Sequence, residues 1–192
     1  MSSPKLTKVQ KLSLEIVSKV GCINEDKIKD LGLNNHTLSK MCEFGYLTKE
    51  SFKYKGENHT IYRPDTLGKK YINNHFDRPY HTQSKKHDYE LCNQYSKLNE
   101  VDRNNVITER QCYDLLLEKI DNEEDYYTQS ILREELHNNQ ISCPDLMVCR
   151  CVNDVVEYEC IEVITSSYTR EQIQSKVRYC EVMGSSYTSS RI

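Results

Sequence analysis

The chain has 192 residues, and its 26 Lys and Arg against 29 Asp and Glu give a formal net charge of −3. It contains no run of about 18 apolar residues, which excludes a membrane-spanning helix, and its N-terminus without an apolar leader predicts a cytoplasmic protein. The nine cysteines are odd in number and lie mostly in apolar patterns, which predicts reduced, buried thiols instead of a disulfide framework.

Charge is distributed unevenly along the chain. Residues 1–86 hold 16 Lys and Arg against 9 Asp and Glu, whereas residues 87–192 hold 10 against 20. Two domains of opposite electrostatic character are therefore predicted, and the basic one is suited to a polyanion. The polar segment 74–86, which has a proline and no periodicity, is predicted to link a domain at 1–73 to a domain at 87–192.

Hydrophobic periodicity predicts three helices in the first domain, over residues 7–20, 25–31 and 34–47. Their ends are marked by the stop residues Gly21 and Gly32, and by the cap residues Asn24 for the second helix and Asn34 or Asn35 for the third. The third helix has a polar side that consists of Asn35, His36, Thr37, Ser39 and Lys40. Short donors and acceptors with one cation are the side chains that reach base edges and phosphates.

Alternating residues around Gly56 predict a two-stranded hairpin from Phe52 to Arg63, followed by a short helix over residues 67–72. The hairpin carries the cations Lys53, Lys55 and Arg63. Three helices, a tight connection between the second and the third, and a hairpin together make a winged helix-turn-helix.

The segment with Gly45-Tyr-Leu47, the hairpin and Leu67-Gly-Lys-Lys-Tyr71 resembles the winged-helix family. The resemblance covers about the first seventy residues. It implies that the third helix binds double-stranded DNA while the hairpin holds the backbone. The alternative is a winged helix that contacts protein. Such domains often bind as a homodimer on paired half-sites, although the sequence shows no dimer surface.

The second domain opens with an amphipathic pattern over residues 87–98. Thr108 and Gln111 form a predicted capping box for a helix from residue 109 to about 120, and a short β-prone segment precedes that box. For residues 126–136 the sequence does not decide between helix and strand.

Two apolar runs on either side of Asn153-Asp154 predict a β-hairpin with a two-residue turn. In that register Asp145 lies directly opposite Glu162, and Cβ atoms of opposed residues are about 4.5–5.5 Å apart. Two carboxylates at this separation repel each other unless a divalent cation or a shared proton lies between them, and Mg²⁺ or Mn²⁺ suits oxygen ligands. The alternatives are an exposed acidic pair at the end of a sheet, or a slip of one residue that separates the two onto opposite faces.

A second capping box, Thr169 with Gln172, predicts a helix that ends near Met183. Its buried stripe is expected to consist of Ile173, Val177 and Cys180, with Gln172, Lys176 and Tyr179 on a neighbouring face. Because the helix follows the second strand directly, it can bring Lys176 near the two carboxylates. Residues 184–192 are too short and polar to predict a further element.

Ile107-Thr-Glu-Arg110, Pro144-Asp145-Leu-Met-Val148 and Glu162-Val-Ile-Thr165, followed by the helix with Lys176, resemble the PD-(D/E)xK nuclease fold. More narrowly, the chain resembles the replication-relaxation group of mobile elements, which joins an N-terminal winged helix to such a domain. The resemblance implies an α+β protein whose second domain is a small α/β domain with a central mixed sheet. It also implies a site made of Glu109, Asp145, Glu162 and Lys176. In active members the acids hold Mg²⁺ or Mn²⁺, a bound water attacks, and a Lys orients it.

The motif departs from the family because Ile164 stands where the family has Lys, and Lys176 or Arg170 is the candidate replacement. An inactive or degenerate site is therefore expected. The leading hypothesis is a double-stranded-DNA-binding accessory or regulatory protein of a plasmid, conjugative element or phage, which acts in replication, mobilisation or transcription control and needs no cofactor. One alternative is a divalent-metal-dependent DNA nuclease targeted by its winged helix. Another is a protein-binding inhibitor encoded by a mobile element, whose acidic domain binds a basic partner.

Overall fold

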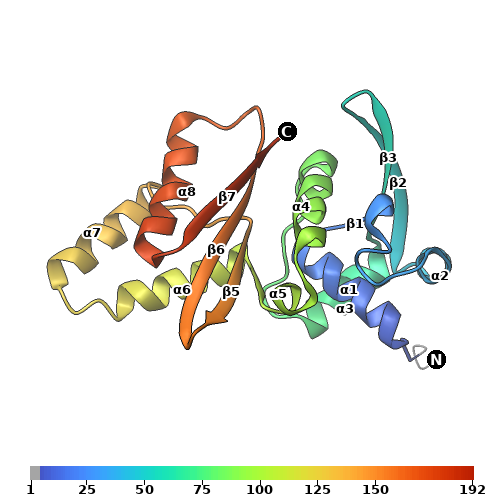
Figure 1. Ribbon diagram of the computed structural model, residues 1–192, viewed down its shortest axis with the longest axis horizontal. Coiled ribbons are helices and arrows are strands. Elements are labelled where there is room, and N and C mark those ends of the chain that lie inside the picture. Colours follow the sequence, from blue (N-terminus) through green and yellow to red (C-terminus); the bar gives the residue numbers. More distant parts are fainter. Residues whose placement is uncertain (1–4) are drawn as a thin grey trace. The chain divides into compact units, whose positions relative to one another are not determined.

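A computed structural model describes residues 5–192 and belongs to the α+β class, as predicted (Figure 1). The first four residues, part of the segment predicted to carry no leader, lie outside the described residues. The chain divides into two compact units, Met1–Leu98 and Asn99–Ile192. The first unit holds 17 Lys and Arg against 11 Asp and Glu, and the second holds 9 against 18. Within residues 5–192, no helix is long and apolar enough to cross a membrane.

The first unit is built on a three-stranded antiparallel sheet with strand order β1-β3-β2. Its elements are α1 (Lys8–Val20), β1 (Ile23–Asn24), the 3-10 helix η1 (Glu25–Lys27), α2 (Asn35–Glu43), β2 (Leu47–Tyr54), β3 (Glu57–Pro64), α3 (Thr66–His75) and α4 (Lys85–Lys97). β2 and β3 form a long hairpin with Lys55 and Gly56 in its turn (Figure 1). Both turn residues have positive φ, which is the conformation that matches the twist of a two-residue hairpin.

The start and end of α1 follow from its sequence. The Gln10 side chain accepts a hydrogen bond from the Thr7 amide at 2.9 Å, and the Thr7 hydroxyl accepts one from the Gln10 amide at 3.3 Å. This reciprocal capping satisfies two amides that have no partner inside the helix. At the other end Gly21 has a φ of 79°, the left-handed conformation that terminates helices.

The next two helices are shorter than predicted. The 3-10 helix η1 covers only three residues, and turns continue the chain to Gly32. The N-terminal cap of α2 is Asn34 and not Asn35. The Asn34 side chain accepts a hydrogen bond from the Thr37 amide at 2.8 Å. α2 ends at Glu43, four residues before the predicted end, because Leu47 begins β2 and pairs with Pro64.

α4 belongs to the first unit, so the predicted domain boundary is wrong. The linker predicted at residues 74–86 places this helix in the second domain, whereas the units divide after Leu98. The buried Asp88 of α4 forms an ion pair with Arg63 of β3 at 2.8 Å and accepts a hydrogen bond from the Tyr80 hydroxyl at 3.1 Å. Tyr89 packs edge-on against Phe52 of β2, with ring centroids 5.6 Å apart. An amphipathic pattern shows that a helix has a buried face but not which unit buries it.

The second unit has a four-stranded mixed sheet with strand order β4-β5-β6-β7. Its elements are α5 (Glu100–Asn104), β4 (Val106–Thr108), α6 (Glu109–Asp121), α7 (Tyr126–His137), β5 (Leu146–Val152), β6 (Val155–Ile164), α8 (Arg170–Met183) and β7 (Ser186–Arg191). The core lies between the sheet and three helices, and it includes Leu116 of α6, Leu132 of α7, Met147 of β5 and Tyr179 of α8.

The predicted register of the β5–β6 hairpin is confirmed. Leu146 pairs with Ile161 and Val152 pairs with Val155, so Asn153 and Asp154 make the turn. Both turn residues have positive φ, at 51° and 62°. Asn and Asp tolerate this conformation better than other residues with a Cβ atom, which is why they can replace the usual glycine here.

Two expectations for the end of the chain are wrong. Residues 186–191 form β7, which pairs parallel with β6 although its sequence is polar. On α8, Lys176 and Tyr179 are buried, while Val177 is 37% exposed, so the buried stripe is rotated from the predicted one. Hydrophobic periodicity cannot predict a buried lysine on a helix, because it assigns charged residues to the solvent-facing side.

Candidate functional site

The second unit brings its predicted acids together at the start of the β5–β6 hairpin. Glu162 lies on β6, and Asp145 directly precedes β5. Each carboxylate accepts a hydrogen bond from the opposite chain segment: Glu162 Oε2 from the Asp145 amide at 2.9 Å, and Asp145 Oδ2 from the Val163 amide at 2.8 Å. Both acids are buried, with 1% or less of their surface exposed. The predicted exposed acidic pair is therefore not what forms.

Lys176 supplies the positive charge of this group. Its Nζ atom lies 3.1 Å from Glu162 Oε1 and donates a hydrogen bond to the carbonyl oxygen of Cys143. The Tyr168 hydroxyl donates to the same Glu162 oxygen at 3.0 Å. Of the two predicted replacements for the missing motif lysine, Lys176 reaches the acids, whereas Arg170 is exposed at the start of α8. We call Asp145, Glu162, Tyr168 and Lys176 the acidic cluster.

Burial and mutual repulsion dominate the electrostatics of the acidic cluster. Burial, followed by the charge of Asp145, raises the pKa of Glu162 to about 7, and Lys176 opposes this rise. Burial lowers the pKa of Lys176, but the charges of Glu162, Asp145 and Glu109 outweigh burial and hold this pKa above its ordinary value. Glu109, the first residue of α6, thus acts on the cluster through its charge.

Tyr168 is the one member of the acidic cluster that the sequence does not predict. It lies in the loop between β6 and α8, where no periodicity indicates which side chains turn inward. Burial and the charges of Glu162 and Asp145 raise the pKa of its phenol, so the hydroxyl keeps its proton and donates to Glu162. The only signal in the sequence is an aromatic residue directly before a predicted capping box.

The arrangement is a poor fit for a catalytic Mg²⁺ or Mn²⁺ ion. A catalytic metal needs ligands with free lone pairs and an open position for water and substrate. Here Lys176 already neutralises Glu162, two backbone amides occupy carboxylate oxygens, and both acids are buried. Among the described residues, no group of three or more His, Cys, Asp or Glu is arranged to hold a metal ion.

We expect wild-type protein to leave supercoiled plasmid intact in the presence of Mg²⁺ or Mn²⁺, because the carboxylates are buried and paired with Lys176. Agarose gels that separate supercoiled from nicked plasmid test this directly. The matched control is Asp145→Asn, which keeps the size of the side chain and removes its charge. Metal-dependent nicking by the wild type that disappears in this variant would contradict the assignment.

In the first unit the predicted polar side of α2 faces solvent. Asn35, His36, Ser39 and Lys40 are exposed, Thr37 is half-buried, and Leu38 and Met41 point into the core. On the hairpin, Lys53 and Lys55 are exposed near the turn. We call these exposed α2 residues together with Lys53 and Lys55 the α2–hairpin face.

Arg63 does not belong to the α2–hairpin face, although it was predicted to contact DNA. Its guanidinium forms the ion pair with Asp88 at 2.8 Å and donates to the Gln83 carbonyl oxygen at 3.2 Å. Its side chain is only 18% exposed. A cation committed to a buried carboxylate holds α4 to the sheet and is not available to a phosphate.

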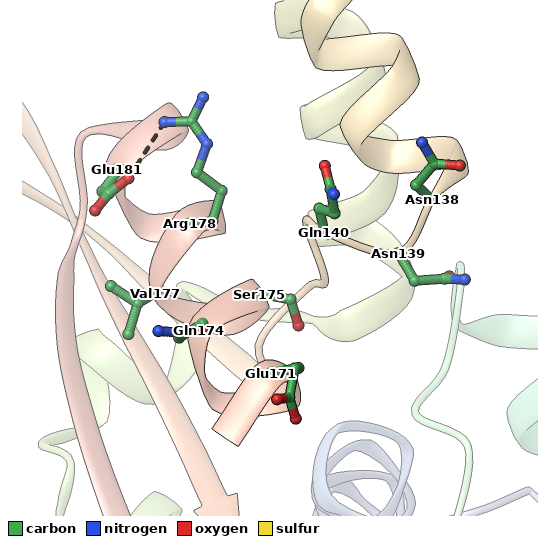
Figure 2. Close-up of a pocket in the computed structure, with 9 residues that line it drawn as sticks. All are labelled: Asn138, Asn139, Gln140, Glu171, Gln174, Ser175, Val177, Arg178 and Glu181. Atoms are coloured by element: carbon green, nitrogen blue, oxygen red, sulfur yellow. Dashed lines mark hydrogen bonds and ion pairs between the residues drawn. The ribbon is translucent and has the colours of Figure 1, made fainter. Parts of the chain in front are cut away.

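A polar hollow of about 730 Å³ lies between the end of α7 and α8 (Figure 2). Amide side chains of Asn138, Asn139 and Gln140 line it on the α7 side. Among its described lining residues the cation is Arg178, which is paired with Glu181 at 3.2 Å and with Glu135 at 3.0 Å. The hollow therefore has no cation free for an anionic ligand, and none of the acids of the acidic cluster lines it.

Comparisons with known proteins identify no relatives: no family model, curated protein or solved structure matches this chain.

Proposed function

We propose that this chain is a double-stranded-DNA-binding accessory or regulatory protein of a plasmid, conjugative element or phage. In this proposal the first unit acts as a winged helix-turn-helix, with α2 as its recognition helix and the β2–β3 hairpin as its wing. The replication-relaxation resemblance of the sequence supports a role in replication, mobilisation or transcription control.

The observation that carries the proposal is the division of α2 into two sides. Leu38 and Met41 anchor the helix in the core, so its opposite side is held outward as a rigid surface. That surface carries an amide, an imidazole, a hydroxyl and an ammonium group within two turns. Asn, Ser and His side chains can read base edges in the major groove, which is wide enough to admit a helix.

The hairpin supplies the second part of the proposed interface. It projects from the sheet, and α2 lies beside its base (Figure 1). Lys53 and Lys55 lie next to and in its turn. Neither lysine forms an ion pair among the described residues. Lys55 Nζ lies 4.9 Å from the centre of the Tyr54 ring, and both lysines are exposed. Exposed ammonium groups on a projecting hairpin suit the phosphate backbone next to the groove, because phosphate contacts position the protein while base contacts specify the sequence.

The net charges of the two units also support DNA binding by the first unit and not by the second. The first unit is basic, and a basic surface attracts DNA before any specific contact forms. The second unit is acidic and does not favour DNA by its overall charge. We assign it to assembly with other proteins of the element, for which a basic partner would be complementary.

Replacing Lys40, Lys53 or Lys55 with Ala is expected to weaken binding to all duplex sequences alike. Each lost phosphate contact should lower the slope of log K against log salt by about 0.9. Electrophoretic mobility shifts over a salt series measure that slope. The matched control is Lys97→Ala, an exposed lysine at the end of α4 that lies outside the α2–hairpin face. An unchanged salt slope in all three variants would contradict the proposed interface.

Replacing Asn35, His36 or Ser39 with Ala is expected to change which duplex sequence is preferred. A bidentate contact between a side chain and a base contributes about 1–3 kcal/mol of discrimination, or roughly fivefold to more than a hundredfold in affinity. Selection of bound duplexes from a random pool, with wild type and variants in parallel, measures the preference. Equal loss of affinity for every sequence would show that these residues do not read bases. Absence of any duplex binding at low salt, together with capture of a basic protein partner, would instead support the protein-binding alternative.

A further inference from the structure

A second hollow, of about 400 Å³, lies in the first unit between the start of the chain and α3. Lys5 and Lys11 contribute to it from the region of α1, and Lys70, Tyr71 and His75 contribute from α3. Tyr46 and two leucines supply apolar surface. We call it the α1–α3 hollow. None of the residues of the α2–hairpin face lines it, so it needs a separate explanation.

The charge of the α1–α3 hollow is positive and not compensated locally. Its described lining contains three lysines and no Asp or Glu. Some exposed lysines of the same unit are paired, such as Lys49, which lies 2.6 Å from Glu25, and Lys85, which lies 2.8 Å from Glu50. Three ammonium groups around one depression repel each other, and a bound anion relieves that repulsion. The polar hollow of the second unit has the opposite character, because its arginine is paired with two carboxylates.

One wall of the hollow is a flat aromatic surface. The rings of Tyr71 and His75 stack with centroids 3.9 Å apart and an interplanar angle of 8°. His75 Nδ1 lies 2.9 Å from the Tyr71 carbonyl oxygen, which fixes the imidazole against the phenol. Leu67, one turn earlier on α3, is 46% exposed beside them. Leu67, Tyr71 and His75 therefore form one stripe of apolar and aromatic side chains along the helix, in which Leu67 and His75 are exposed and Tyr71 is half-buried.

Lysines together with a stacking surface define the class of ligand. Inorganic anions need only the cations, and apolar ligands need only the stripe. A nucleoside phosphate needs both, because its phosphate binds cations while its base stacks on aromatic rings. We propose that the α1–α3 hollow binds a nucleoside phosphate, with the phosphate among Lys5, Lys11 and Lys70 and the base against the Tyr71 ring. The nucleoside phosphate is either a free nucleotide or the terminal nucleotide of a nucleic acid strand.

Calorimetric titration of the full chain with AMP, inorganic phosphate and adenosine tests the proposal. The wild type should bind AMP more tightly than phosphate and more tightly than adenosine. Lys11→Gln with Lys70→Gln should weaken AMP binding at least about tenfold, because two charge-assisted contacts are lost. Tyr71→Leu should weaken AMP binding at least about fivefold and leave phosphate binding unchanged, because only stacking is lost.

The matched control is Lys69→Gln, an exposed lysine on the same helix that does not line the hollow. Its AMP affinity should equal that of the wild type. Equal affinity of the wild type for AMP and phosphate, or equal AMP affinity in the double lysine variant and the Lys69 control, would overturn the proposal. Circular dichroism of each variant verifies that these surface changes leave the fold intact.

A further comparison distinguishes a free nucleotide from the end of a nucleic acid strand as the natural ligand. A single strand with a 5′-phosphate that binds more tightly than AMP identifies a strand end as the occupant, whereas tighter binding of AMP identifies a free nucleotide. Either result supports the hollow as a nucleoside phosphate site. Duplex binding through the α2–hairpin face is measured separately, with Lys40→Ala and Lys53→Ala. A failed duplex experiment leaves the AMP titration unaffected, and a failed AMP titration leaves the duplex result unaffected.

Discussion

Lys176→Met is expected to lower the free energy of unfolding of the second unit by about 3–5 kcal/mol at pH 8. The substitution keeps much of the buried hydrocarbon chain and removes the ammonium group that lies 3.1 Å from Glu162 Oε1. It leaves two buried carboxylates without their cation, and it leaves the Cys143 carbonyl oxygen without its donor. Removing one partner of a buried ion pair costs far more than the pair contributes, because the remaining charge stays desolvated. Denaturant unfolding followed by circular dichroism measures the loss.

The same variant should show a distinctive pH dependence. The pKa of Glu162 is about 7 in the folded protein and 4.5 ordinarily, so the folded state binds more protons between these values. Stability contributed by this carboxyl is therefore greatest below pH 4.5 and falls as pH rises toward 7. Without Lys176 the pKa of Glu162 rises further, and the fall continues to higher pH. We expect the difference between variant and wild type to be clearly smaller at pH 5 than at pH 8, with the lost hydrogen bond to the Cys143 carbonyl oxygen contributing at both.

Two further variants separate the buried pair from an ordinary ion pair. Arg178→Met on the same helix removes a half-exposed cation paired with Glu135 and should cost less than about 1 kcal/mol at either pH. Adding Glu162→Gln to Lys176→Met should recover much of the stability at pH 8, because it removes one of the uncompensated buried charges. A pH-independent loss, or no recovery in the double variant, would show that Lys176 acts through its hydrogen bond to the Cys143 carbonyl oxygen and not through the charge of Glu162.

The acidic cluster was largely predictable from the sequence because it depends on local pairing. Once Asn153 and Asp154 are taken as the turn, strand periodicity alone places Asp145 opposite Glu162. The capping box at Thr169 then fixes where α8 begins, and a helix that starts there carries Lys176 back along β6. Each of these steps uses residues close in sequence, so no long-range contact has to be guessed.

The features that the sequence does not predict all depend on contacts between residues far apart in the chain. The stripe of α4 contacts α1 and β1 of the first unit through residues far away in sequence, such as Cys92, which accepts from the Asn24 amide at 3.3 Å. The strand β7 is polar, and it forms because β6 has a free edge that satisfies its backbone groups. The burial of Lys176 follows from partners on two other segments. Arg63 was assigned to DNA by charge, and only the position of Asp88 shows its other role.

Gly68→Ala is expected to destabilise the first unit by about 3 kcal/mol or more. A Cβ atom at this position would lie 2.0 Å from the Tyr46 carbonyl oxygen and 3.1 Å from its carbonyl carbon. These are backbone atoms of the segment that joins α2 to β2, and hydrogen bonds hold them in place: the Asp65 amide donates to Tyr46 at 3.0 Å, and the Leu67 amide donates to Gly45 at 3.1 Å. The extra methyl group therefore has to push α3 away from this segment. Thermal unfolding of variant and wild type measures the cost.

Gly32→Ala is the control that separates this clash from a general effect of replacing glycine. Gly32 has a φ of 70°, and a Cβ atom there meets nothing within 4 Å. Its replacement should cost only the left-handed backbone strain, about 1–2 kcal/mol. Because the Tyr46 segment also sets where α2 ends, Gly68→Ala should weaken duplex binding more than Gly32→Ala does at a temperature where both variants are folded. Equal stability of the two variants would mean that α3 and the Tyr46 segment are not in close contact.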